Sequence, residues 1–459
     1  YASHILGTVG PIYSEEWDYY NERGYQMNAL VGKSGCEAAF EEYLHGTDGK
    51  LKVTFDENGT VIKTETVVEP QSGLDVYLTI DIDMQIAAED ALAENVADVK
   101  VRDQNTTAAK NGFECNAGAA VAMAPTTFEI LAVASYPTFD LTTYNRDYND
   151  LAAMDGNPLL NHALRGVYAP GSTFKPCTAI ASLTEGIINT GTTIECRGQY
   201  TRYAQYGFAP YCWIYTQNNQ KLTHGYLNVT GAIQNSCNIF FYSAGHDLGI
   251  DKLDKYAAEF GLGESTGIEL PESTGNMANA KNHEELTGEP WTIGQTMQAA
   301  IGQSDSLFTP LQLAEYCAAV ANGGERHSAS ILKSVRSYSY GDNVHEREDE
   351  VLSKVETAQY NWDAVHEGMR LVGKSSLPNY SITSVAAKTG TAQKGDSIAN
   401  DGIFICYAPF DDPEIAMAIV VQKGGAGANC SVIAQEILEA YFSLKSATDV
   451  TDVEGELLQ

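Results

Sequence analysis

The sequence is poor in basic residues. Its 459 residues include 28 Lys and Arg against 60 Asp and Glu, which gives a formal net charge of −32. A general nucleic-acid binder needs a positive surface that displaces counterions from phosphates, so this composition argues strongly against that class. The same charge argues against docking on an anionic membrane surface. We therefore expect no nucleic-acid partner.

Long hydrophobic runs are also missing. The longest apolar stretches, such as 415–421, are far shorter than the roughly 18 residues that a membrane-spanning helix requires. The sequence begins at Tyr1 without an initiator Met and without the features of a signal peptide. No phosphate-cradling Gly-rich loop and no internal repeat is visible. These absences predict the processed or trimmed soluble portion of a longer protein.

The remaining composition is that of a folded protein. Hydrophobic residues make up 44% and charged residues 19%, which is typical of globular chains of two or three domains. Nine cysteines cannot all pair within the chain, and no dense disulfide framework is present. Cysteine usage alone therefore does not decide the cellular compartment.

The chain divides into three parts by pattern. Residues 1–72 are rich in Gly, Glu and Tyr, and the turn residues around 70–73 indicate a boundary. Residues 73–446 form the main domain, and the acidic residues of 447–459 predict a frayed tail.

Strand patterns lie early and late, with mostly helical patterns between them. Strands are expected at 51–55, 60–68, 75–80, 117–124, 129–135, 402–408 and 414–422, and helices at 84–96, from 309–310 to 322 and at 430–444. This order predicts an α+β domain with an antiparallel sheet that is completed by distant segments, flanked by helices and accompanied by a helical subdomain.

The first chemical motif is Ser172 with Lys175. Both follow Gly171 at the start of an apolar helical pattern, where residues three apart share one face. A Ser hydroxyl is a poor nucleophile, and a neutral amine beside it can take its proton. Alone the motif is weak, because Ser330 and Lys333 repeat the same spacing.

Two further motifs follow. Ser236-Cys237-Asn238 lies within 233–241, which is spaced like a helix, so it also fits an ordinary polar patch at a helix end. Lys388-Thr389-Gly390-Thr391 lies in a strand-like segment from residue 384, where a charged residue can also protect an edge strand from mispairing. Ser-x-x-Lys, a Ser-x-Asn-type element and Lys-Thr-Gly, in this order, are the joint signature of penicillin-binding proteins and serine β-lactamases.

With these motifs the chain resembles the class B penicillin-binding proteins, the monofunctional peptidoglycan D,D-transpeptidases. Segments 31–41, 78–81, 300–303 and 309–312 resemble the pedestal linker, the start of the transpeptidase domain and its helical segment. The resemblance implies a transpeptidase domain of serine β-lactamase-like fold at 73–446. It also implies that 1–72 is part of an N-terminal pedestal, or dimerisation, domain.

The resemblance further implies a place and partners. The family works at the extracytoplasmic face of the cell membrane, held by an N-terminal helix that this sequence lacks. Its substrates are peptidoglycan stem peptides that end in D-Ala-D-Ala, and β-lactam antibiotics acylate it. Its pedestal meets a membrane-embedded glycan polymerase.

Each motif residue then has an expected role. Ser172 attacks the carbonyl between the two D-alanines, D-alanine leaves, and the amine of a second stem peptide takes the acyl group. Lys175 is the base, with its pKa lowered by burial and by a cation such as Lys388. Ser236 relays the proton to the leaving amine, and Asn238 donates to Lys175 and to the substrate.

The third motif is expected to bind the substrate's carboxylate. Lys388, Thr389 and Thr391, with Gly390 between the hydroxyl residues, supply a positive charge and hydroxyl groups. Backbone N–H groups of Ser172 and, by resemblance, Thr391 form the oxyanion hole. The reaction needs no cofactor.

Cys196, Cys212, His224 and Cys237 predict a structural zinc site. Three thiols and one imidazole match a closed Cys₃His site, although the spacings are longer than those of a zinc finger. Some elongation-type relatives carry a similar zinc with two carboxylates in place of Cys196 and Cys212. A disulfide between Cys196 and Cys212, or plain burial of these residues, is an alternative. Zinc would fix the neighbours of Cys237, outside the chemistry itself.

Two other functions use the same residues. A β-lactam hydrolase needs a base that activates the deacylating water, and no such residue is identified in this sequence. A non-catalytic scaffold would bind cell-wall peptides without turnover. The biological role in elongation, division or sporulation, the acceptor amine and the oligomeric state stay open.

Overall fold

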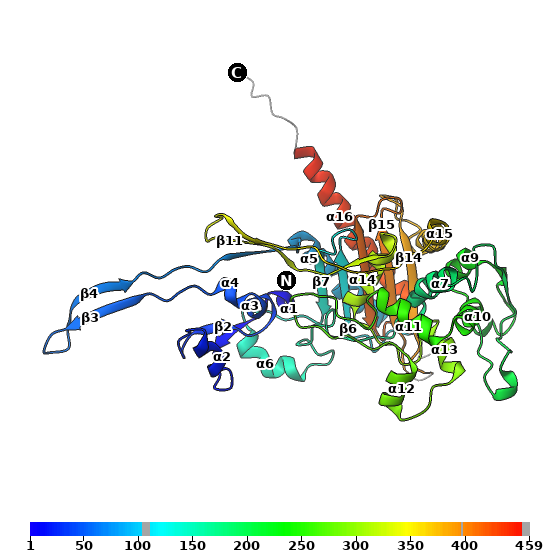
Figure 1. The fold of residues 1–459 in the computed structure, drawn as a ribbon, viewed down its shortest axis with the longest axis horizontal. Coiled ribbons are helices and arrows are strands. Elements are labelled where there is room, and N and C mark those ends of the chain that lie inside the picture. Colours follow the sequence, from blue (N-terminus) through cyan, green and yellow to red (C-terminus); the bar gives the residue numbers. More distant parts are fainter. Residues whose placement is uncertain (103–110, 396–397, 452–459) are drawn as a thin grey trace, which may run out of the picture.

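The computed structural model describes residues 1–102, 111–395 and 398–451, without the side chains of 447–451. A long two-stranded ribbon, β3–β4, extends from one end of a larger body that contains the main sheet (Figure 1). The N-terminal elements lie between the ribbon and that body. They are α1 (Ser3–Leu6), β1 (Val9–Pro11), α2 (Trp17–Glu22), β2 (Leu30–Gly32), α3 (Gly35–Ala39) and α4 (Glu41–Leu44). The two ribbon strands are β3 (Lys50–Phe55) and β4 (Val61–Val68).

The ribbon has the expected hairpin form. Residues 56–60 connect its two antiparallel strands, and Asp56 accepts from the N–H groups of Asn58 and Thr60 at 2.8 and 2.9 Å. Every residue of β3 and β4 is exposed.

The main sheet joins the early and the late strands, as predicted. Its order is β14-β15-β16-β6-β7, and all neighbouring strands are antiparallel. Its strands are β6 (Ala117–Met123), β7 (Ile130–Tyr136), β14 (Ala386–Ala392), β15 (Asp401–Ala408) and β16 (Ile415–Gln422). Ala117 on β6 pairs with Gln422 on β16, so the centre of the sheet forms between segments about 300 residues apart.

Both faces of the sheet are covered, which explains why β15 and β16 are almost continuously apolar. Alternate residues enter two cores: Val121 and Ala418 face one, and Ala122 and Met417 face the other. Helices α5 (Ile82–Val101) and α16 (Ser431–Thr451) cover the second face. Helix α14 (Pro310–Ala321) covers the first (Figure 1).

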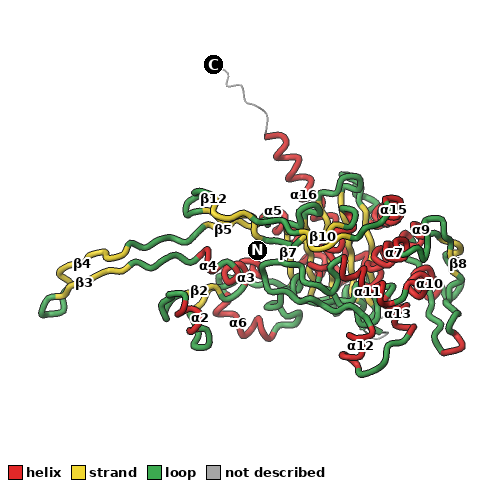
Figure 2. Tube along the Cα trace, viewed as in Figure 1, coloured by secondary structure: helices red, strands yellow, loops and turns green. Residues whose placement is uncertain are grey.

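Most other helices form the predicted helical part on one side of the sheet (Figure 2). They are η2 (Gly171–Phe174), α7 (Lys175–Thr184), η3 (Ala204–Tyr206), α8 (Trp213–Gln217), α9 (Val229–Gln234), α10 (Asn238–Leu248), α11 (Ile250–Glu259), α12 (Ala280–Thr287), α13 (Ile293–Ala299) and α15 (Gln359–Ser376). Helix α6 (Tyr144–Ala153) lies instead near the N-terminal elements (Figure 2), and η4 (Gly427–Cys430) directly precedes α16. The remaining strands are short: β5 (Asp75–Leu78), β8 (Ile194–Cys196), β9 (Gly225–Leu227), β10 (Glu325–His327), β11 (Leu332–Arg336), β12 (Asn343–Glu346) and β13 (Val351–Lys354).

The start of α14 follows its sequence signal. Thr309 is the N-cap and Pro310 the first residue, and a capping box with Gln312 satisfies the first backbone N–H groups. Asn322 is the C-cap. The boundaries predicted from these residues are confirmed.

Two expectations need correction. Helix α16 continues to Thr451, into the segment expected as a tail from residue 447, and the acidic residues of 452–459 lie outside the described residues. Residues 300–303, which resemble a helical segment, form a turn after α13. The expected strand at 75–80 is present as β5, which pairs with β11 outside the main sheet.

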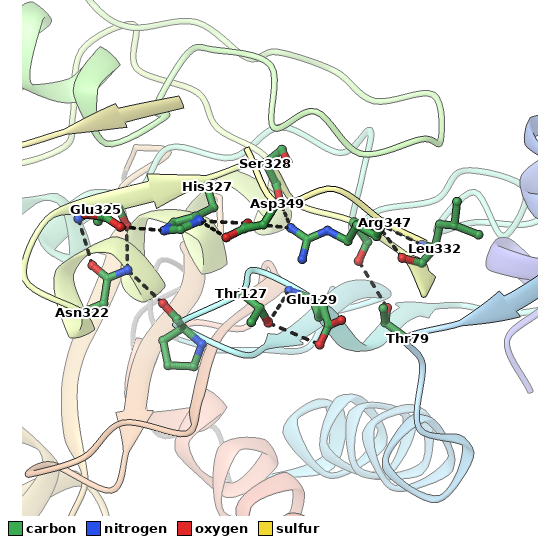
Figure 3. A network of polar contacts seen from close by, with 12 residues as sticks. Thr79, Thr127, Glu129, Asn322, Glu325, His327, Ser328, Leu332, Arg347 and Asp349 are labelled. Atoms are coloured by element: carbon green, nitrogen blue, oxygen red, sulfur yellow. Dashed lines mark hydrogen bonds and ion pairs between the residues drawn. The ribbon is translucent and has the colours of Figure 1, made fainter. Parts of the chain in front are cut away.

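A polar network holds β10 against the neighbouring loop (Figure 3). His327 lies between two carboxylates, with Nδ1 2.8 Å from Asp349 and Nε2 3.2 Å from Glu325. Arg347 donates to the Ser328 carbonyl oxygen at 2.7 Å. These bonds fix the edge of the small β10–β13 sheet.

Among the helices of the described ranges, none combines the length and the apolar character needed to cross a bilayer. All nine cysteines are buried, free thiols. Cys177, Cys317 and Cys406 are small core residues, because each is fully buried.

Candidate active site

Ser172 lies in a tight turn that leads into a helix. The turn is the 3₁₀ segment η2, and the α-helix proper begins at Lys175, three residues later than the sequence predicts. Gly171 has φ 54°, and its N–H donates to the Gly302 carbonyl oxygen at 2.8 Å. A Cβ on Gly171 would lie 2.9 Å from the Thr391 carbonyl oxygen. Glycine therefore allows η2 to approach strand β14 closely.

Lys175 connects the first two motifs. Its Nζ lies 2.9 Å from Ser172 Oγ and 3.0 Å from Ser236 Oγ, and it donates to the Ser236 carbonyl oxygen at 2.8 Å and to Asn238 Oδ1 at 2.7 Å. The side chain is fully buried. Asn238 thus accepts from Lys175 through its oxygen, so the expectation that its amide donates to this lysine is wrong.

These four contacts suit a neutral amine. A neutral lysine has two N–H donors and one lone pair. The Ser236 carbonyl oxygen and Asn238 Oδ1 can only accept, so they take the two N–H groups. The lone pair is then left for a hydroxyl, and Ser172 Oγ is within hydrogen-bond distance. This arrangement lets Lys175 take the proton of Ser172.

Ser236 lies in a break between two helices. Helix α9 ends at Gln234 and α10 begins at Asn238, with Cys237 as its N-cap. Ser236 has φ 49°, a left-handed conformation that is uncommon outside glycine and is frequent at functional sites. The break turns the side chains of Ser236 and Asn238 toward Lys175.

Lys388 reaches the same point from the edge strand of the main sheet. Its Nζ donates to Ser236 Oγ at 3.1 Å and to the Thr389 carbonyl oxygen at 3.0 Å, and the side chain is fully buried. The position on an edge strand agrees with the simple structural interpretation of this motif. However, a charge prevents mispairing only where it is exposed along the edge of the sheet, and the Lys388 side chain is fully buried.

The rest of the third motif lies against the nucleophile's turn. A Cβ on Gly390 would lie 2.7 Å from the Pro170 carbonyl oxygen, so glycine is required at this contact. Thr389 and Thr391 are partly exposed. The Thr391 hydroxyl oxygen accepts from the Gly427 N–H at 3.3 Å, which leaves its own hydrogen free to bind an anion.

Burial controls the charge of both lysines. It lowers the pKa of Lys175 to about 8. Burial, and then the charge of Lys175, lower the pKa of Lys388 well below its usual value. We expected the charge of Lys388 to lower the pKa of Lys175. The repulsion between the two amines instead lowers the pKa of Lys388.

The four predicted metal ligands lie together beside this site. Their ligand atoms are all within 4.8 Å of one another. Strand β8 pairs with β9 so that Cys196 faces Gly225, the residue after His224. Cys212 is the N-cap of α8 and Cys237 that of α10. The ends of two strands and the N-caps of two helices therefore converge on one point.

The cluster has the chemistry of a ligand set. Hydrogen bonds with Cys196 and then Cys237 hold the pKa of the Cys212 thiol well below its usual range. His224 Nδ1 lies 3.5 Å from Cys212 Sγ, and its Nε2 is buried without a hydrogen-bond partner. The Cys212 thiolate and the unpaired His224 nitrogen are ligands of the kinds that Zn²⁺ prefers.

Sequence reasoning missed the backbone groups of the site. The Ser236 carbonyl oxygen binds Lys175, and the Gly302 carbonyl oxygen binds Gly171. Residues 300–303 were noticed because they resemble a family segment. Their contact with η2, through the Gly302 carbonyl oxygen, depends on the turn that they form and could not be predicted.

The fold and this arrangement define an acyl-transferring enzyme of the serine type. Residues 118–442 match the model of the penicillin binding protein transpeptidase domain, and residues 1–78 match that of the penicillin-binding protein dimerisation domain. The chain belongs to the penicillin-binding protein transpeptidase family, as its motifs predict.

Known proteins of this family resemble the chain along nearly its whole length. Peptidoglycan D,D-transpeptidase MrdA of Escherichia coli K12 is 28% identical over 98% of this chain and 71% of its own length. The crystal structure of Pseudomonas aeruginosa PBP2 in complex with WCK 5153 has a TM-score of 0.79 and 28% identity, covering 96% and 88% of the two chains. A structure that describes polymerization and crosslinking by a peptidoglycan synthase complex has a TM-score of 0.82 and 29% identity, covering 99% and 76%.

Proposed function

We propose that the chain cross-links peptidoglycan by D,D-transpeptidation through an acyl-enzyme on Ser172. The observation that carries this proposal is the contact of Lys175 Nζ with Ser172 Oγ at 2.9 Å, made by a fully buried amine whose pKa burial lowers. The names of the relatives support the same reaction.

The reaction has two balanced halves. Lys175 takes the Ser172 proton while Oγ attacks the carbonyl between the two terminal D-alanines of a stem peptide. The C–N bond breaks, and the proton passes through Ser236 Oγ to the departing amino group of D-alanine. An amine of a second stem peptide then attacks the ester carbonyl and forms the new amide bond while the C–O bond to Ser172 breaks. Lys175 takes the proton that this amine loses and returns it to Ser172 Oγ. The ester conserves the energy of the original amide bond, so no nucleotide is needed.

The third motif would bind the substrate's terminal carboxylate. In a chain of net charge −32, an anion needs a local positive group, and Lys388 is one. The hydroxyls of Thr389 and Thr391 are placed to donate beside it, and Gly390 keeps their strand against η2. The backbone N–H groups of Ser172 and Thr391 would hold the oxyanion.

Intact-mass measurement after incubation with penicillin tests the proposal. One covalent adduct should form on the wild-type chain and none on Ser172→Ala. Slow release of the adduct agrees with a transpeptidase that β-lactams inhibit. Rapid turnover of penicillin would instead identify a hydrolase, and a wild-type chain without an adduct would identify a scaffold.

We also propose a place and a partner. A peptidoglycan substrate places the enzyme at the extracytoplasmic face of the cell membrane. The similar structure of a peptidoglycan synthase complex supports a membrane-embedded glycan polymerase as the partner, bound by residues 1–72. Co-purification of the polymerase with the chain, lost when residues 1–72 are exchanged, tests this assignment.

We place the boundary between the pedestal and the transpeptidase domain at residues 72–73. Strand β5 supports it, because its residues from Asp75 pair with β11 of the main body. Limited proteolysis that cuts first near residue 72 agrees with this boundary.

We propose that Cys196, Cys212, His224 and Cys237 hold a structural zinc ion. In tetrahedral zinc sites neighbouring ligand atoms lie about 3.3–3.8 Å apart, and the cluster needs only a small contraction to reach this spacing. Bound zinc would neutralise the thiolates and hold Cys237 in place. The free thiols of Cys196 and Cys212 do not support a disulfide. Elemental analysis of protein purified without chelator should give one zinc per chain, and absence of metal would refute the site.

A further inference from the structure

A half-buried indole lies behind the Ser236 turn. Trp213 is the first residue of α8, and its Nε1–H donates to the carbonyl oxygens of Asn235 and Ser236, at 3.1 Å each. The Ser236 carbonyl oxygen is the same atom that accepts from Lys175 Nζ at 2.8 Å. One backbone oxygen thus joins the indole to the proposed base.

The Ser236 turn needs this support because its backbone is strained. The residue has φ 49°, and surrounding contacts must hold a non-glycine residue in that region. The Ser236 N–H donates to Ile233 at 3.1 Å and the Cys237 N–H to Ala232 at 2.9 Å. These bonds fix the amide groups of the turn, whereas Trp213 and Lys175 contact its carbonyl group.

The indole is itself held from the other side. Trp213 follows the N-cap Cys212, and its ring packs against His224 with 5.7 Å between ring centroids. The indole thus lies between the Cys/His cluster and the Ser236 turn, and its N–H points toward the turn. A ring fixed in this way can orient a carbonyl group with little loss of side-chain freedom.

We propose that Trp213 is a positioning residue for acylation. Its indole N–H holds the Ser236 carbonyl oxygen where that oxygen takes one N–H of Lys175. The remaining lone pair of Lys175 then faces Ser172. This inference rests on the proposed function, and it adds a residue that lies outside the three motifs.

Acylation kinetics with a fluorescent penicillin test the inference. A concentration series separates the limiting rate of acylation from the dissociation constant of the non-covalent complex. Trp213→Phe keeps an aromatic ring and removes the donor. It should lower the limiting rate about tenfold, since an ordinary hydrogen bond contributes about that factor, and leave the dissociation constant within about twofold.

The chain offers a matched control. The Trp291 indole donates to Thr296 Oγ1 at 2.9 Å, away from the three motifs, so Trp291→Phe should change neither constant. If Trp213→Phe folds poorly, replacement of Trp213 by the benzothiophene analogue, which has sulfur in place of N–H, keeps the full ring shape. The same selective loss of rate is expected.

The outcomes separate this inference from the proposed function. If the wild-type chain is acylated and both Trp213 variants keep the wild-type limiting rate, the inference is wrong and the proposed function still stands. A parallel loss of rate, penicillin affinity and melting temperature in both variants would assign Trp213 to packing and also overturn it. If the wild-type chain forms no adduct, the proposed function fails, and the inference fails with it.

Discussion

The amines of Lys175 and Lys388 converge on one hydroxyl group, with Nζ atoms 3.0 and 3.1 Å from Ser236 Oγ. Both lysines are fully buried, so desolvation opposes their charge, and the charge of Lys175 also opposes that of Lys388. We therefore expect the two amines together to carry less than two positive charges near neutral pH. A substrate carboxylate beside Lys388 would then draw the shared charge toward that residue and keep Lys175 neutral.

The first prediction concerns the nucleophile. Ser172→Ala should form no covalent adduct with penicillin, because the attacking oxygen is gone, and its melting temperature should stay within a few degrees of wild type. Intact-mass spectrometry measures the adduct. Ser330→Ala is the matched control, since Ser330 and Lys333 repeat the Ser-x-x-Lys spacing, and this variant should still be acylated. An adduct on Ser172→Ala contradicts the assignment.

The second prediction is a pH dependence. Lys175 accepts a proton only when neutral, and burial lowers its pKa to about 8. The acylation rate should therefore fall about tenfold for each pH unit below about 8 and level off above it. Stopped-flow acylation in buffers of constant ionic strength measures this profile. A rate that rises toward acid pH would contradict a neutral amine as the base.

The third prediction separates binding from chemistry at Lys388. Lys388→Gln removes the positive group proposed for the carboxylate, so acylation efficiency should fall about 10- to 100-fold, the range of a charged hydrogen bond. The loss should be much smaller for a penicillin methyl ester, which has no carboxylate. Equal losses for the acid and the ester would show that Lys388 acts in another way.

The fourth prediction concerns the Cys/His cluster. Cys212→Ser should lose the bound zinc and lower the melting temperature by at least about 5 °C, because metal binding stabilises the folded state. Cys317→Ser, which changes a buried thiol outside the cluster, should keep the metal. Equal zinc content in both variants would count against this ligand set.

The fifth prediction uses the close contact of β14 with η2. Gly390→Ala places a methyl group 2.7 Å from the Pro170 carbonyl oxygen, so the edge strand must move. A displacement of even 1 Å costs about 100-fold in a reaction that depends on position. Gly191→Ala, at an open site with ordinary φ, is the control. Unchanged acylation by Gly390→Ala would show that the contact is dispensable.

The main sheet was predictable because its signals are local. Strands β6–β7 and β15–β16 are apolar runs of seven or eight residues with short polar turns between them. The catalytic residues were predictable because three weak motifs occur together in a fixed order. The Cys/His cluster was predictable by residue type, but its long spacings gave no indication that β8, β9 and two helix caps converge.

The break at Ser236 was not predictable in the same way. Residues 233–241 have the apolar spacing of a continuous helix, yet α9 and α10 are separate. The left-handed conformation of Ser236 is stabilised by Trp213 and Lys175, which are distant in sequence. The pairing of β5 with β11 has the same origin in contacts that no local pattern encodes.

The pairing of β6 with β16 has a consequence for biosynthesis. A chain that leaves the ribosome in order carries its nucleophile at position 172 long before strands β14, β15 and β16 exist. Until those strands arrive, β6 and β7 have no central partner, and Lys388 is not yet present. A chain that ends before β14 lacks Lys388 and the strand that contacts η2, so we expect its site to stay incomplete until synthesis is nearly finished.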